Sequence, residues 1–186
     1  MDIDVNGRTV TNSDNNIFTI KNEAALNLSG SGWLKGNLLI EEGGALTMNG
    51  SLDVDNITHH GSALTMNTQT DKLNIVLARD KRITLGDDFS CDSLKISLDN
   101  DVLAALNDDM EEAGDIVIAE NAGEDLVSKV TIAGLTNKLV SLQRRDDGSL
   151  TLHKELLTGV FIDGEKGSDD NTGLSYDAPV KSFDRA

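Results

Sequence analysis

The stretch Ala25–Gly30 (ALNLSG) returns at Ala45–Gly50 as ALTMNG and again at Ala63–Asn67 as ALTMN, at spacings of 20 and 18 residues. A short phrase that returns at such a spacing is typical of repeat architectures, in which each unit buries its apolar face only by stacking on the next unit. The sequence therefore predicts a solenoid.

Each repeat is expected to contribute two short strands. Phe18 and Ile20 precede the first copy of the phrase, as Leu38 and Ile40 precede the second. Apolar and polar residues alternate in these segments, which places the apolar side chains on one face of each strand. Glycine-containing corners separate the strands, at Ser29–Gly32, Glu42–Gly44 and His60–Ser62. The predicted fold class is all-β, a parallel β-helix.

The composition fits a thin, elongated core. Hydrophobic residues make up 38% of the 186 residues and aromatic residues only 3%, which is low for a compact core. Stacked aliphatic rows need few aromatic residues, and 17 glycines beside a single proline suit tight corners between strands. Composition and repeat thus agree.

The chain is strongly acidic, with a net charge of −16. Phosphates repel such a chain, so we expect neither nucleic acid nor an anionic membrane surface as a partner. The carboxylates serve either solubility or the binding of Ca²⁺, which prefers oxygen ligands. One cysteine, Cys91, excludes an internal disulfide framework, and no apolar run is long enough to span a bilayer. The chain is either cytosolic or a segment of a longer secreted protein.

After about residue 98 the repeat fades. Residues 101–113 carry apolar residues at helical spacings and predict a short helical insertion, and residues 115–120 predict a strand. Residues 124–134 predict a helical turn that runs into a strand. Residues 139–152 predict a hairpin that turns at Asp147–Gly148 and closes one end of the stack.

The last thirty residues differ from the repeats. Val160–Gly164 predicts an apolar strand, and a polar loop follows it. Asp177 is predicted to be the N-cap of a helix with Pro179 in its first turn and an apolar stripe that begins at Val180 and Phe183. We therefore divide the chain into a β-helix repeat domain, residues 1–155, and the start of a following β-helix domain, residues 156–186.

This final segment resembles the opening of the right-handed parallel β-helix domains of the pectate-lyase-like superfamily. The matching residues are Gly167, Ser168, Asp169, Asn171, Gly173, Pro179, Lys181, Phe183 and Ala186. Residues 16–152 in turn resemble β-helix segments of large surface proteins from Gram-positive gut bacteria. The resemblance implies right-handed coils and an extracellular or cell-surface bacterial protein of several domains, and it does not by itself imply an enzyme.

Four residues are candidates for contact with a ligand. Trp33 and Tyr176 are the two side chains suited to stacking on a sugar ring, although packing over a coil end also accounts for Trp33. Arg79 and Arg82, with Lys81, form the only basic cluster of the repeats. This cluster serves either to contact an acidic sugar or to protect an exposed strand edge by its charge.

Metal binding is predicted at one place, with calcium as the metal. Asp163, Asp169, Asp170 and Asn171 offer oxygen ligands suited to Ca²⁺, but their spacing is not that of a known calcium loop. The adjacent His59 and His60 would point to opposite faces of a strand, so they do not form a metal site without a bend. We expect no other cofactor.

The sequence shows no catalytic motif, and the spacing of its carboxylates selects no catalytic pair. The first hypothesis is a non-catalytic structural or adhesive module of a bacterial surface protein, which contacts host or cell-wall glycans or a surface protein. The alternative is an accessory domain of a polysaccharide lyase or glycoside hydrolase whose catalytic coils lie beyond residue 186. A third hypothesis, a phage tail fibre, predicts a trimer.

Overall fold

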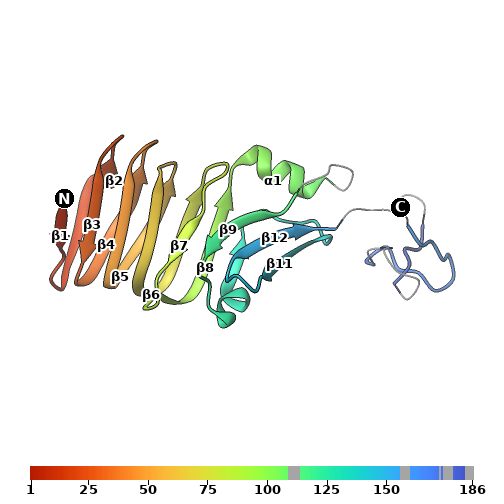
Figure 1. Cartoon of the computed structure of the whole chain (residues 1–186). Coiled ribbons are helices and arrows are strands. Elements are labelled where there is room, and N and C mark those ends of the chain that lie inside the picture. The colour runs from red at the N-terminus through yellow and green to blue at the C-terminus, as the bar shows by residue number, and fades with distance from the viewer. Residues whose placement is uncertain (109–113, 156–159, 172, 174–177, 183–186) are drawn as a thin grey trace.

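The computed structural model describes residues 1–108, 114–155, 160–171, 173 and 178–182, with the side chains of residues 13–15 excepted. Most of this chain forms a parallel β-solenoid of about four turns, whose coils follow one another from the N-terminal end in Figure 1. The coils contain β1 (Asp2–Asp4), β2 (Arg8–Ile20), β3 (Ala25–Ser29), β4 (Ser31–Ile40), β5 (Ala45–His59), β6 (Ala63–Leu77), β7 (Ile83–Leu85) and β8 (Ser90–Leu98). The closing elements are α1 (Asn100–Asn107), β9 (Ile116–Glu120), the 3₁₀ helix η1 (Glu124–Lys129), β10 (Val130–Ile132), β11 (Val140–Arg144) and β12 (Leu150–Lys154).

The repeated phrase stacks directly on itself. Ala25 pairs with Ala45 and Ala45 with Ala63, and the next three positions of the phrase pair in the same register. The second and fourth positions point into the core, and their side chains are at most 5% exposed: Leu26, Leu28, Leu46, Met48, Leu64 and Met66. The predicted stack of parallel coils is therefore confirmed.

A second sheet lies between successive copies of the phrase and supplies the other rows of the core. One of these rows consists of Ile20, Ile40, His59, Leu77 and Leu98, which pair one after another from β2 to β8. All five side chains are at most 9% exposed. One histidine thus takes a place in an otherwise aliphatic row.

Polar side chains connect neighbouring coils. Asn37 Nδ2 donates a hydrogen bond to Asn16 Oδ1 at 2.8 Å, and Thr58 Oγ1 donates one to Asn37 Oδ1 at 3.1 Å. Asn16 and Asn37 are register partners on β2 and β4, whereas Thr58 lies two residues beyond Asn56, which is the partner of Asn37 on β5. The stacking of the coils therefore brings these side chains within reach of one another both at paired positions and at diagonal ones.

The corner that follows the phrase brings the backbones of successive coils close together, which restricts the residue at this position. Gly30 and Gly50 both have positive φ angles, 93° and 92°, and a Cβ on Gly50 would lie 2.2 Å from the carbonyl oxygen of Gly30. Thr68 takes this corner in the next coil. Its buried hydroxyl donates to the carbonyl of Gly50 and accepts from the N–H of Leu52, both at 3.0 Å. A threonine hydroxyl therefore satisfies the backbone where the glycine is lost.

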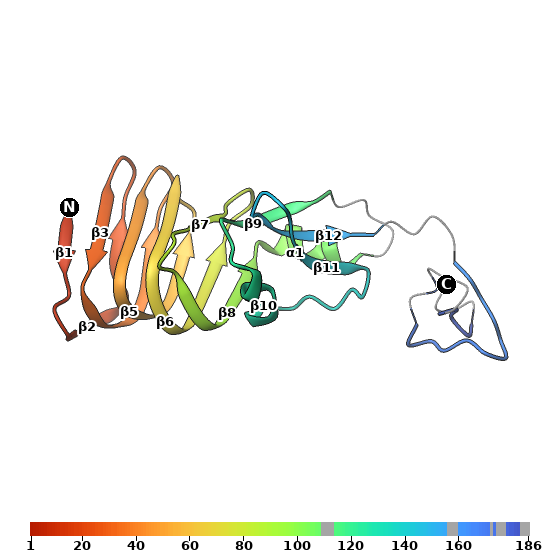
Figure 2. The same ribbon diagram turned by 60° about the horizontal axis from the view of Figure 1, so that its bottom comes forward.

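Parallel pairing continues past residue 98, where the repeat disappears from the sequence. β9 pairs with β7, and β10 pairs with β8. The antiparallel hairpin of β11 and β12 then joins this end through pairing of β12 with β9. Figures 1 and 2 show α1 and the hairpin at the end of the stack opposite the N-terminus. The predicted helical insertion, strand, helical turn and hairpin are confirmed, with residues 109–113 outside the described part.

Lys154 connects the hairpin to the helix. This side chain is 4% exposed, and its ammonium donates hydrogen bonds to the carbonyl oxygens of Ala105, at 2.7 Å, and Asp108. These carbonyls lie at the C-terminal end of α1, where helices leave unsatisfied acceptors and favour a positive charge. The lysine therefore holds the two closing elements together.

The structure of residues 160–182 corrects two sequence predictions. The apolar strand predicted at Val160–Gly164 is reduced to one isolated parallel bridge between Ile162 and Val180. The predicted helix from Asp177 does not form over residues 178–182, and Asp177 itself lies outside the described residues. The reason is that Val180 is held extended: its N–H donates to the carbonyl of Phe161, and its carbonyl accepts from Asp163.

No helix of the described chain is long and apolar enough to cross a membrane. The division into domains at residues 155 and 156 stays a prediction.

Candidate functional site

Trp33 lies on the outer face of β4, and 45% of its surface is exposed. Its indole Nε1 donates a hydrogen bond to Asp55 Oδ1 on the next coil at 3.0 Å. The ammonium of Lys35 lies 4.4 Å from the centre of the indole ring, in the geometry of a cation–π contact. Because Leu34 between them is fully buried, Trp33 and Lys35 share the outer face of the strand. The ring is thus held in place while much of it stays accessible.

Polar side chains of two further coils surround this ring and form a shallow groove. The groove is lined by Trp33, Asp53, Val54, Asp55, Asn56, Asp71, Lys72 and Asn74. Asp53 pairs in register with Trp33, and its Oδ1 accepts from Thr70 Oγ1 at 2.9 Å. Asn74 Nδ2 donates to the backbone carbonyl of Asp55 at 2.9 Å. Side chains from β4, β5 and β6 therefore meet in one surface, which we call the Trp33 groove.

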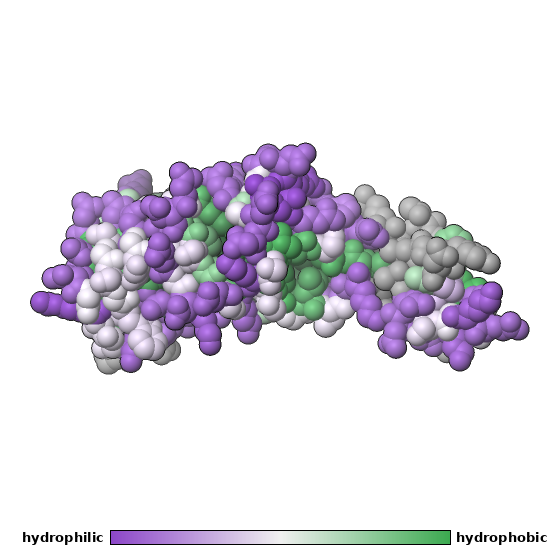
Figure 3. All heavy atoms as spheres, turned by 90° about the horizontal axis from the view of Figure 1, so that it is seen from below, coloured by the Kyte–Doolittle hydropathy of each residue, from purple (hydrophilic) through white to green (hydrophobic). Residues whose placement is uncertain are grey.

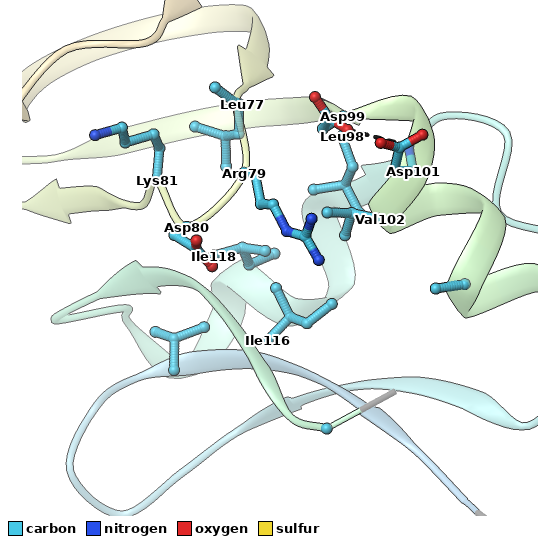
Figure 4. A pocket seen from close by; sticks show the side chains of 14 residues that line it. Leu77, Arg79, Asp80, Lys81, Leu98, Asp99, Asp101, Val102, Ile116 and Ile118 are labelled. Carbon is cyan, nitrogen blue, oxygen red and sulfur yellow. Dashed lines mark hydrogen bonds between the residues drawn. The ribbon is translucent and has the colours of Figure 1, made fainter. Parts of the chain in front are cut away.

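Arg79 lies in the turn between β6 and β7, beside a second cavity. Figure 4 shows its guanidinium extending over Ile116, Val102 and Leu98, whereas the ammonium of Lys81, which also lines the cavity, extends away from Arg79. Arg82, three residues later, forms an ion pair with Glu120 at 2.9 Å, in which both side chains are exposed. The predicted basic cluster is therefore divided: Arg79 faces the cavity, and Arg82 connects the turn to β9.

The predicted ligand-binding residues do not form one site. Trp33 and Arg79 line different cavities. Tyr176 lies outside the described residues. An exposed aromatic side chain and an exposed cation are thus present, but on separate parts of the surface.

The four residues predicted to hold calcium bind parts of their own segment or a neighbouring lysine. Asp163 Oδ1 accepts from the N–H groups of residues 166 and 165, at 3.0 and 2.9 Å, and these bonds lower the pKa of its carboxyl group. Asp169 Oδ1 accepts from the hydroxyl and the N–H of Ser182 and from the N–H of residue 181, and the pKa of this carboxyl group is also lowered. Asn171 Nδ2 donates to the carbonyl of residue 179 at 2.9 Å. Lys138 donates to the backbone carbonyl of Asp170 at 2.6 Å.

Among the residues described, no three histidine, cysteine, aspartate or glutamate side chains gather closely enough to hold a metal ion. The carboxylates of Asp163 and Asp169 instead accept hydrogen bonds from the backbone N–H groups of residues 165, 166, 181 and 182, and so hold these parts of the segment together. Calcium binding by this segment stays a prediction.

The adjacent histidines occupy different environments, as the strand geometry predicts. His59 is 1% exposed, and its Nδ1 has no hydrogen-bond partner among the described residues. Burial, and then the positive charge of Lys81, lower the pKa of His59 to about 4. His60 is exposed. His59 is therefore a neutral core residue under ordinary conditions.

A polar cluster that the sequence did not indicate lies on the closing hairpin. Asp115 Oδ1 is 2.6 Å from His153 Nδ1, and Asp115 Oδ2 accepts from Arg145. These two contacts lower the pKa of Asp115. The cluster is partly exposed. It connects the residue before β9 to β12 and to the turn of the hairpin, which gives it a structural role.

Comparison with protein-family models, with curated proteins and with solved structures found no match to this chain. The function is therefore inferred from the geometry of the surface.

Proposed function

We propose that this chain is a non-catalytic module of a bacterial cell-surface protein, and that its solenoid contacts a glycan through the Trp33 groove. The observation that carries the proposal is the indole of Trp33, 45% exposed and fixed by Asp55 and Lys35. A large aromatic side chain left at the surface loses the free energy of its own burial unless a partner covers it.

The chemistry around the ring suits a sugar. A sugar has a C–H face that stacks on an aromatic ring and hydroxyl groups that need hydrogen-bond partners. Asp53, Asp71 and Asn56 offer carboxylate and amide acceptors beside Trp33, and Lys72 and Asn74 offer donors. Carboxylates that accept from hydroxyls form strong hydrogen bonds.

The shape of the groove favours an extended ligand. Its side chains come from three consecutive coils whose strands are in register. A stack of this kind presents one elongated surface, so a chain of sugars can lie across several coils at once. A neutral or basic glycan is favoured over an acidic one, because the chain has a net charge of −16.

A glycan array tests this proposal. The protein is applied with Ca²⁺ and, separately, with a chelator, so that the calcium prediction for residues 163–171 is tested in the same experiment. We expect binding to a defined set of neutral or basic glycans, and we expect Trp33→Ala to abolish it while Trp33→Phe retains part of it.

Val76→Ala is the matched control. Val76 is another apolar side chain of the solenoid surface, 40% exposed, and it does not line the Trp33 groove. This variant is expected to bind like the unmodified protein. Uniform absence of binding, or binding that Trp33→Ala leaves unchanged, would contradict the glycan proposal and leave a role as a stalk.

A further inference from the structure

The coil stack ends in a cavity that is separate from the Trp33 groove. Its volume is about 340 Å³, which is at the small end of the range for ligand sites. It lies between the β6–β7 turn, the start of α1 and strand β9, and Figure 4 shows it from close by. Hydrophobic residues also gather near the middle of the molecule's length in Figure 3, while hydrophilic ones cover most of that face.

The floor of this cavity is apolar. Leu77, Leu98 and Ile118 belong to the core and are at most 9% exposed, and Val102 and Ile116 are half-buried beside them. No sugar is favoured on such a floor, because its hydroxyl groups would lose their hydrogen bonds to water. The floor instead suits a compact hydrocarbon group.

One cation, Arg79, extends over this floor. Arg79 forms no ion pair and no side-chain hydrogen bond with any residue of the described chain. In Figure 4 its guanidinium lies above Ile116 rather than beside a carboxylate. A guanidinium binds carboxylates in a bidentate manner. The exposed Arg79 is therefore suited to hold the carboxylate of a ligand whose hydrocarbon group covers the apolar floor.

The rim of the cavity restricts the charge of the ligand. Asp80, Asp99 and Asp101 are at the edge, and Asp99 is occupied in part as the N-cap of α1, where it accepts the N–H of Asp101 at 3.0 Å. These carboxylates repel any second negative charge on a ligand. The rim therefore disfavours polyanions such as acidic polysaccharides, although it does not prevent a single carboxylate from reaching Arg79.

We infer that this cavity binds a monocarboxylate with a compact apolar group, which places its carboxylate on Arg79 and its hydrocarbon on Leu98, Val102 and Ile116. A free branched carboxylic acid and the carboxyl-terminal leucine of a peptide share this chemistry. The site does not depend on the Trp33 groove or on glycan binding.

The experiment is a ligand titration followed by NMR on the whole chain. The probes are 4-methylpentanoate, its amide 4-methylpentanamide, and N-acetyl-leucine as a mimic of a peptide terminus. We expect saturable binding of 4-methylpentanoate with shifts confined to residues of the cavity, and at least about tenfold weaker binding of the amide, because the charge-assisted hydrogen bonds are lost. Tighter binding of N-acetyl-leucine than of 4-methylpentanoate would indicate that the ligand is the carboxyl terminus of a peptide rather than a free acid.

Two variants make the result specific. Arg79→Met keeps an aliphatic cover over the floor but removes the cation, and we expect it to weaken binding at least about tenfold. Arg82→Met is the matched control, because Arg82 is paired with Glu120 outside the cavity, and binding should not change. Unchanged melting temperatures show that both variants are folded. The inference is overturned if the unmodified protein does not bind the acid, if the amide binds equally well, or if folded Arg79→Met binds like the unmodified protein.

Discussion

Replacement of His59 by leucine tests whether the core holds this histidine in its neutral form. His59 stands between Ile40 and Leu77 in a row of aliphatic side chains and is 1% exposed. Its buried Nδ1 has no partner in the described chain, and its pKa is lowered to about 4. Leucine has a similar size and continues the row without a polar atom.

The sign of the pH effect follows from the lowered pKa. Between pH 6.5 and pH 4, the unfolded chain takes up a proton at His59 that the folded chain does not accept. The free energy of unfolding therefore falls as the pH falls through this window. From pH 7 to pH 5 the loss due to His59 amounts to about 2 kcal/mol, at about 1.4 kcal/mol for each pH unit below the unfolded pKa. His59→Leu should lose none of this, because leucine takes up no proton.

Urea unfolding of both proteins at pH 7 and pH 5 measures these quantities. The carboxyl groups whose pKa is lowered, such as those of Asp115 and Asp125, titrate below this range and contribute equally to both proteins. His60→Leu is the control, because His60 is exposed and its charge is the smallest of the causes that lower the pKa of His59. This variant should keep most of the pH dependence of the unmodified protein. If His59→Leu and the unmodified protein lose the same stability between pH 7 and pH 5, His59 is not buried in its neutral form, and the reasoning is wrong.

Two further replacements test how the corners and the closing end are stabilised. Thr68→Val keeps the shape of the side chain but leaves the N–H of Leu52 and the carbonyl of Gly50 without the hydroxyl, so the free energy of unfolding in urea should fall by about 1–3 kcal/mol; an unchanged value would show that the hydroxyl is dispensable. Lys154→Met removes the ammonium from the carbonyls of Ala105 and Asp108 at the C-terminal end of α1. Hydrogen exchange of the helix amides should therefore accelerate at least about fivefold, whereas unchanged exchange would contradict the role given to the lysine.

The register of the solenoid could be predicted from the sequence because the repeat is local and periodic. The spacing of the ALNLSG and ALTMNG phrases makes Ala25, Ala45 and Ala63 equivalent, and the structure pairs them in that order. The role of Thr68 could not be predicted from the repeat. The sequence presents it as a loss of the corner glycine, and only the stacked backbone shows that its hydroxyl replaces the missing contacts.

Long-range pairing explains the errors at the C-terminal end. Pro179 and the apolar spacing of Val180 favour a helix locally, but the backbone of Val180 pairs with Phe161 and Asp163 instead. A pairing between segments about twenty residues apart, without a repeat, leaves no periodic signal. The Asp115–His153 contact was missed for the same reason.

The candidate sites were predictable in part. Trp33 was identified by its rarity, and Asp55 could have been found as its partner, since it lies 22 residues later, about one coil along the chain. The separation of Arg79 from Arg82 could not have been found in this way. It depends on Glu120 of β9, which reaches the turn only after the coil stack has closed.

The most direct test of the proposed function uses the fluorescence of Trp33, which is the only tryptophan of the chain. An oligosaccharide selected by the array is titrated into the protein while the indole emission is recorded. We expect a saturable change in intensity and a shift of the emission maximum to shorter wavelength, because the sugar removes water from a ring that is 45% exposed. Saturable binding of the glycan with no change in this emission would contradict the claim that the Trp33 groove is the binding site.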